Sequence, residues 1–410
     1  MAEAASGPIA VATSGTTPVV DVLNPGFLGF PGWDTGYRAK IKTVGSAPLS
    51  VMHIGHSIAF GEEAGDTMGQ GYGFLFRSAA MAKYGAFGDF WSAGLQTSIN
   101  GSVSSFFPYT FSGTGTSAQE DGQGYGQGYA PSGFGTSHDV TFDPTKLGAP
   151  GSAGALAYNF TAMDILACHF NASGTWTWAV DGGAPTTVTN TSNDGLLTRI
   201  PLTGLSSGQH TLTFSSFSAQ TAMVLAGVAT YTGAAGGFAY ANVAQPGQTA
   251  AAALQGAPLT NIQGYQSAGS PTGFGYPAGP DLALIEFGVN DLSQFKTPFA
   301  DPGSFGILLR QLIAALRRAN PTVSIVLVSS WCGPGGNYTD DSGFGQSAVW
   351  HLYEDEMQKA AQRAGLGILS LEQRWGSTPV AQGFISAGTA HHPTTAGHAD
   401  IFNALWTELS

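Results

Sequence analysis

The sequence predicts an α/β fold with a parallel sheet, interrupted by an inserted antiparallel β-sandwich of the jelly-roll kind. Apolar strands alternate with helical patterns from residue 49 and again after residue 236, which is typical of a parallel sheet covered on both faces. Between these parts, short runs of period two separated by Gly-rich turns indicate antiparallel strands. A chain of 410 residues is long enough for two such units.

Composition divides the N-terminal half into three parts. Residues 1–48 are rich in Gly, Pro, Ala and Thr and are predicted to be an irregular arm. In residues 49–100, LSVMHI is typical of a buried strand, and FLFRSAAMAKYG has helical spacing and ends at Gly85. The predicted sandwich occupies residues 101–236, which contain runs such as MDILACHF, GTWTWAV and HTLTFS. A carbohydrate-binding role is one interpretation of it.

Residues 237–410 complete the α/β domain. Its predicted strands are FAYANV, DLALIEF, VSIVLVSS and LGILSL, and its predicted helices are FGILLRQLIAALRRAN, VWHLYEDEMQKAAQRAG and TTAGHADIFNALWTEL.

Charge and composition limit the classes of partner. The chain has a net charge of −12 and only 14 Lys and Arg residues, so nucleic-acid binding is not expected. Its first residues lack a basic start and a sustained apolar run, so neither a signal peptide nor membrane insertion is expected, and an extracellular or phage-virion location remains an open interpretation. Cys168 and Cys332 are interpreted as two buried free thiols rather than as a disulfide scaffold or a zinc module.

Four residues suited to chemistry follow predicted strands or precede the last helix: Ser57, Gly247, Asn290 and His392. In open parallel sheets the ligand crevice lies beyond the carboxyl ends of the strands. The sequence therefore predicts that these residues face one crevice.

The segments around these residues resemble the motif blocks of the SGNH, or GDSL-type, serine hydrolase superfamily, and they occur in the same order. IGHSIAFGE resembles the first block, NVAQPGQT the second, FGVND the third and HHPTTAGHADI the last. The resemblance covers the α/β part, a little over half of the chain. It implies a three-layer, flavodoxin-like sheet, and the inserted sandwich is similar to the β modules of some actinobacterial and phage tail-associated members.

The resemblance also implies a role for each residue. Ser57 takes the position of the nucleophile and His392 that of the general base, because a serine hydroxyl attacks at neutral pH only when an imidazole accepts its proton. The backbone N–H groups of Ser57 and Gly247 and the amide of Asn290 take the positions of the oxyanion hole, where one donor contributes on the order of 3 kcal/mol.

Two positions depart from the family pattern. Thr389 stands where an Asp normally orients the histidine, and loss of that carboxylate costs roughly 10⁴-fold in rate in known triads. His56 stands where an Asp normally precedes the nucleophile, which puts a second imidazole near Ser57. Thr389, His56 and His391 are therefore candidate orienting or accessory residues.

A metal site is the alternative for the C-terminal histidines, because His391, His392, His398 and Asp400 are residue types that bind zinc or manganese. Adjacent side chains on an extended segment point in opposite directions, so no metal and no cofactor is predicted. His53 is interpreted as a core residue and Asp291 as a structural hydrogen-bonding residue.

Trp176 and Trp178 alternate along one predicted strand and therefore share a face. Core packing in the sandwich is the favoured interpretation, and a platform on which a sugar stacks is the weaker one.

The sequence predicts a serine esterase that removes short acyl groups, such as O-acetyl, from a carbohydrate or cell-envelope polymer. The alternative is a catalytically decayed protein of the same fold that binds glycans or a receptor, such as a phage tail component. A thiol or metal enzyme is a third, weaker interpretation.

Overall fold

The computed structural model describes most of the α/β part and the regular parts of the insertion. The described residues are 19–20, 24–61, 64, 70–92, 109–112, 116–118, 128–130, 139–146, 158–169, 171–191, 197–218, 222–244, 247–255, 279–293, 301–332, 347–385 and 391–410.

Six parallel strands form the centre of the larger sheet, in the spatial order β18, β17, β16, β3, β15, β4. Counted along the chain without β4, this is the 2-1-3-4-5 order of flavodoxin-like folds. The strands are β3 Pro48–Gly55, β4 Ala86–Ser92, β15 Gly237–Asn242, β16 Leu282–Glu286, β17 Ser324–Ser329 and β18 Gly367–Ser370. The five strands predicted in the α/β part are confirmed.

Helices cover both faces of this sheet, as predicted. Tyr37, helix α4 and helix α11 contribute to one core cluster, whereas α5, α8 and α9 contribute to the other. Alternate residues of β3 divide between the two faces, since Val51 belongs to the first cluster and Met52 to the second. The helices are α1 Thr35–Ile41, α2 Ser57–Phe60, α4 Tyr72–Tyr84, α5 Ala250–Gln255, α7 Val289–Ser293, α8 Pro302–Ala319, α9 Ser347–Ala364, α10 Leu371–Trp375 and α11 Thr395–Leu409.

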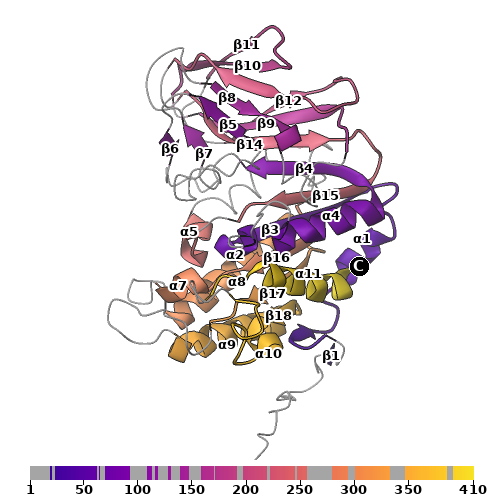
Figure 1. The fold of residues 1–410 in the computed structure, drawn as a ribbon, viewed down its shortest axis with the longest axis vertical. Helices are drawn as coiled ribbons and strands as arrows, with labels where there is room; N and C mark the ends of the chain where they lie inside the picture. Colours follow the sequence, from indigo (N-terminus) through magenta and orange to yellow (C-terminus); the bar gives the residue numbers. More distant parts are fainter. Residues whose placement is uncertain are drawn as a thin grey trace, which may run out of the picture.

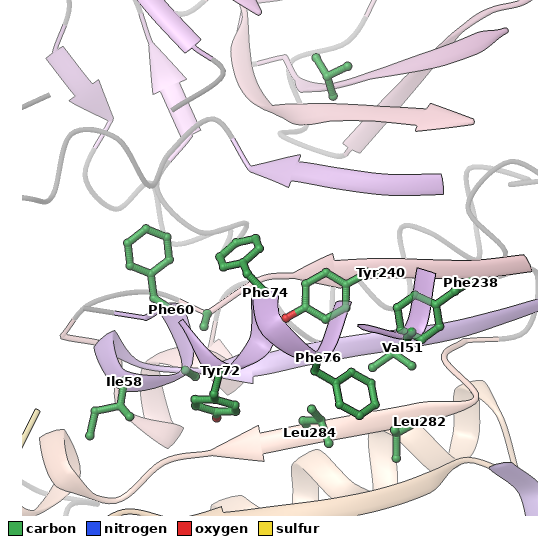
Figure 2. Close-up of a cluster of buried hydrophobic side chains, with 14 of the residues drawn as sticks. Val51, Ile58, Phe60, Tyr72, Phe74, Phe76, Phe238, Tyr240, Leu282 and Leu284 are labelled. Carbon is green, nitrogen blue, oxygen red and sulfur yellow. The ribbon is translucent and has the colours of Figure 1, made fainter. Parts of the chain in front are cut away.

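Aromatic side chains fill the space between α4 and the sheet (Figure 2). The Phe74 ring lies 6.1 Å from that of Tyr240, and the Phe76 ring lies 6.1 Å from that of Phe238, measured between centroids. These contacts join the helix that follows Ser57 to the strand that precedes Gly247.

The insertion is joined to the α/β part through a shared sheet. Strand β14 (Val224–Tyr231) pairs antiparallel with β4, so the parallel sheet continues into the insertion (Figure 1). The continuation also contains β6 Thr116–Ala118, β7 Gly128–Ala130, β9 Ala162–Cys168 and β12 Leu197–Leu202.

A second, antiparallel sheet has the order β11, β10, β13, β8, β5. Its strands are β5 Tyr109–Ser112, β8 Asp139–Phe142, β10 Thr175–Val180, β11 Thr186–Thr189 and β13 Leu212–Ser215. Its buried side chains, such as Phe214, belong to the same core cluster as Ile165 of β9. The two antiparallel sheets therefore share a core, and the jelly-roll connectivity stays a prediction.

The prediction of an irregular N-terminal arm is wrong for residues 24–48. Strand β2 (Phe27–Gly29) pairs antiparallel with β18 at the sheet edge and with β1 (Val19–Val20). In α1, Tyr37 is fully buried and its backbone N–H donates to Ser324 Oγ at 3.1 Å. These residues are ordered by contacts with β17 and β18, far along the chain, which their own composition does not indicate.

A buried ion pair lies where the insertion joins the α/β part. Arg77 of α4 and Asp89 of β4 are 2.5 Å apart between Nη2 and Oδ2, and their side chains are 2% and 1% exposed. The Tyr158 hydroxyl donates to the same Asp89 oxygen at 2.9 Å and lies 2.8 Å from Thr230 Oγ1 in β14. This cluster therefore links α4 and β4 to the insertion.

No described helix has both the length and the apolar character needed to cross a membrane.

Candidate active site

Ser57 begins a short helix directly after the central strand β3. The backbone is tightly enclosed there, because a Cβ on Gly55 would lie 2.6 Å from the Glu286 carbonyl oxygen of the neighbouring strand. His56 has an extended backbone, and its Nδ1 accepts a hydrogen bond from the Ile58 N–H at 3.3 Å, which caps α2. The chain therefore turns sharply, and Ser57 lies at the carboxyl edge of the sheet.

His392 lies next to Ser57, although the two residues are 335 positions apart. The distance from Ser57 Oγ to His392 Nε2 is 2.7 Å. With Nε2 unprotonated, the serine hydroxyl donates to the imidazole, which is the arrangement that proton transfer requires.

The segment that carries His392 is fixed from both sides. Thr394 caps α11 by accepting from the Gly397 N–H at 3.3 Å, and its own N–H donates to the Phe384 carbonyl at 2.9 Å. The Thr395 hydroxyl donates to the Ala64 carbonyl at 2.7 Å. These bonds hold the imidazole close to α2.

Burial lowers the pKa of His392 to about 3, and the neighbouring His391 and His398 lower it further in the same direction. The pKa of His56 is also lowered to about 3, first by burial and then by His392 and His391. At pH 5 to 8 these imidazoles are neutral, so His392 is able to accept a proton. The same environment disfavours the imidazolium that forms when it does so.

The loops after β15 and β16 bring Gly247 and Asn290 together. The Asn290 amide donates to the Gln248 carbonyl at 3.1 Å, next to Gly247 in the chain. Gly247 has a φ of 78° and nothing lies within 4 Å of where a Cβ would be, so the need for glycine is conformational. Gly247, in the loop after β15, and Asn290, in the short helix α7 after β16, therefore lie close together.

Asp291 ties these two loops to each other. Its carboxylate accepts from the Ala250 N–H at 3.0 Å and from the Gly288 N–H at 3.2 Å. Burial raises the pKa of Asp291 to about 6, while these backbone donors oppose the rise. The structural role predicted for this residue is confirmed.

Asn242 joins the nucleophile turn to the loop after β15, and sequence analysis assigned it no role. Its amide donates to the Ala59 carbonyl at 3.1 Å, and its Oδ1 accepts from the Ala244 N–H at 3.0 Å. Its place at the end of an apolar strand, at the start of NVAQPGQT, was the available signal.

A buried polar network crosses the sheet below the site and was also missed. The Tyr72 hydroxyl donates to Glu286 Oε2 at 2.6 Å, and the Ser330 hydroxyl donates to Glu286 Oε1 at 2.7 Å. His53 lies 2.7 Å from the Tyr72 hydroxyl and 3.2 Å from that of Tyr240. His53 is thus a core residue, as interpreted, and Glu in the apolar strand DLALIEF was the only local signal.

Burial raises the pKa of Glu286 to about 7, although the two hydroxyl donors lower it. The folded state therefore favours the protonated form of Glu286. This contribution to stability is fully present below the unfolded pKa of about 4.5 and is lost as pH rises through 7. We expect Glu286→Gln to remove this titration, so wild type loses on the order of 3 kcal/mol of unfolding free energy relative to the variant between pH 4.5 and 8. Urea unfolding of both proteins across this range measures it. Two parallel stability curves would contradict the assignment.

The prediction that the adjacent histidines of the C-terminal segment point in opposite directions is wrong. The His391 and His392 rings do not point in opposite directions, since their centroids are only 4.1 Å apart. His398 Nδ1 accepts from the Tyr72 N–H at 3.4 Å, and Asp400 pairs with Arg374. Among the described residues, no three His, Cys, Asp or Glu side chains are grouped to hold a metal ion.

The structure does not place every predicted site residue. Thr389 lies outside the described residues. Trp176 is fully buried and its Nε1 donates to Asn190 at 3.3 Å, so no face of its ring is accessible to a sugar. Trp178 is partly buried and packs against the same core, which favours core packing for both rings.

Cys332 is a buried free thiol, as interpreted. Burial raises its pKa to about 12, and Glu372 raises it further. A thiol of this kind is a poor nucleophile at neutral pH. The side chain of Cys168 lies outside what the structure describes.

Comparison with known families adds independent evidence. Residues 224–399 match the model of the GDSL-like Lipase/Acylhydrolase family. The α/β part resembles GDSL-type acylhydrolases. The match contains Gly247, Asn290 and His392 and begins after Ser57, so the position of Ser57 rests on the geometry described above. The family match supports the interpretation of the chain as an ester hydrolase of the SGNH, or GDSL-type, superfamily.

Among solved structures, one likeness supports the fold. A peptidoglycan O-acetylesterase structure is 12% identical, with a TM-score of 0.60 over 92% of this chain and 95% of that chain. A family two carbohydrate esterase from Clostridium thermocellum is 15% identical, with a TM-score of 0.29 over 73% of this chain and 97% of that chain. A search of curated proteins found no match. At these identities the first likeness supports the fold alone.

Proposed function

We propose that this protein is a serine esterase that removes short acyl groups, such as O-acetyl, from a carbohydrate or cell-envelope polymer. The observation that carries the proposal is the 2.7 Å contact between Ser57 Oγ and His392 Nε2 at the carboxyl edge of the sheet. The family match supports ester hydrolysis.

In the proposed mechanism, His392 accepts the Ser57 proton while Oγ attacks the ester carbonyl. The N–H groups of Ser57 and Gly247 and the Asn290 amide stabilise the resulting oxyanion. Protonated His392 then donates to the leaving alcohol, and water hydrolyses the acyl-enzyme by the reverse sequence. Each step uses only groups of this chain and water.

The neutral state of His392 suits its role as a base, and its low pKa makes the protonated intermediate costly. The likeness to a peptidoglycan O-acetylesterase supports acetyl esters of sugar hydroxyls as the first substrate class to test.

Release of acetate tests the substrate class. We expect the wild-type chain to release acetate from O-acetylated peptidoglycan or O-acetylated xylan, measured by an enzyme-coupled acetate assay with chelator present. Chemically de-acetylated polymer is the substrate control, and the Ser57→Ala variant is the protein blank. Hydrolysis of an aryl acetate without acetate release from either polymer would contradict the polymer substrate and leave the esterase chemistry intact.

A further inference from the structure

A groove of about 440 Å³ lies between α8 and α9, away from the candidate active site. From α8, Arg310, Ala314, Arg317 and Arg318 line it at positions i, i+4, i+7 and i+8, which places them on one face of the helix. From α9, Arg363 lines it beside small apolar residues. Four guanidinium groups therefore surround one apolar floor.

This concentration of positive charge contrasts with the rest of the chain. The chain has 14 basic residues and a net charge of −12, and four of the 14 line this groove. Arg310 has only a long contact with Glu356, 3.6 Å between Nη1 and Oε2, and Glu356 also pairs with Lys359. Within the described part of the chain, the other three arginines of the groove make no ion pair.

Interaction with the helix dipoles explains part of this arrangement. Arg317, Arg318 and Arg363 lie in the last turns of their helices, where cations are favourable, and Arg317 donates to the Ala364 carbonyl at 2.5 Å. Arg310 lies in the middle of α8, so the dipole does not account for it. Four like charges around one groove repel each other unless an anion binds between them.

We propose that this groove binds linear inorganic polyphosphate. Guanidinium groups bind phosphate oxygens in a planar, bidentate geometry, and arginine is favoured over lysine for this purpose. Residues 310 to 318 span about 12 Å along the helix, which exceeds one phosphate group and accommodates successive groups of a chain.

The groove is separate from the site of the proposed esterase. The site lies at the carboxyl ends of the strands, whereas the groove is formed by the second half of α8 and the end of α9, which lead into the amino ends of β17 and β18. Binding in the groove therefore does not depend on whether Ser57 is a nucleophile.

Binding of medium-length linear polyphosphate by the full chain, measured by isothermal titration calorimetry, tests the proposal. We expect salt-sensitive binding that Arg318→Gln with Arg363→Gln weakens at least about tenfold. The matched control, Lys42→Gln with Lys83→Gln, removes the same charge on the opposite face of the sheet and should change affinity less than about twofold. Arg310→Gln, away from the helix ends, replaces the double variant if that variant is less folded by circular dichroism.

The remaining outcomes overturn the proposal. Equal weakening in the control pair means general electrostatic attraction. Orthophosphate that binds as tightly as the polymer means a single-anion site. Binding to phosphatidylglycerol vesicles, without binding to the polymer, means a membrane surface. Aryl ester hydrolysis by the arginine variants should equal that of wild type, which keeps this test distinct from that of the proposed function.

Discussion

Ser57→Ala is expected to lower kcat/KM for a short-chain aryl ester by at least about 10⁴-fold, which is the largest effect of any single substitution proposed for this chain. The hydroxyl lies 2.7 Å from His392 Nε2, where it is placed to transfer its proton and to attack. Alanine fits the same turn, so the fold and the N–H donors remain. Initial rates measured at pH 7.5 with chelator present give the ratio.

Ser329→Ala is the matched control for this variant. Ser329 is fully buried and ends β17 at the same edge of the sheet, and its Oγ has no hydrogen-bond partner among the described residues. Its removal should change kcat/KM only a few-fold. If Ser57→Ala kept wild-type turnover, another nucleophile would be responsible and the assignment of Ser57 would be wrong.

Asp89→Ala is expected to lower the free energy of unfolding by about 3 to 5 kcal/mol. The substitution leaves the Arg77 guanidinium buried without its carboxylate and removes the acceptor of the Tyr158 hydroxyl. Burial raises the pKa of Asp89 in spite of the adjacent guanidinium, so keeping this carboxylate ionised in the folded protein costs free energy. Equilibrium urea denaturation followed by tryptophan fluorescence measures the loss.

Asp34→Ala is the control for the buried pair. Asp34 pairs with Arg38 at 3.0 Å, but the two side chains are 30% and 40% exposed, so its loss should cost less than about 1 kcal/mol. Replacing both partners, Arg77→Met with Asp89→Leu, should recover much of the lost stability, because no charge is then left buried. Equal losses for Asp89→Ala and Asp34→Ala would show that the buried pair has no special importance.

The order of strands and helices in the α/β part was predictable because each element has a local signature. Residues 302–319 carry an apolar face at helical spacing, and residues 282–286 are almost wholly apolar. Glycine at residue 85 and threonine at residue 394 mark helix ends in the expected way.

Local patterns misjudged features that depend on distant partners. Residues 24–48 appeared irregular in composition, yet β2 pairs with β18, more than 300 residues away. The His391 and His392 rings lie 4.1 Å apart, and His392 contacts the distant Ser57, so the alternation of an extended chain does not describe them.

The sequence by itself determined the α/β element order and the candidate residues Ser57, Gly247, Asn290 and His392. Only the tertiary structure decided that Ser57 touches His392, that β14 extends the parallel sheet through β4, and that Glu286 is buried among hydroxyl groups. The physical reason is that propensity and periodicity act over a few neighbouring residues. The pairing of an edge strand and the desolvation of a charged group depend instead on residues far away in the sequence that pack against them.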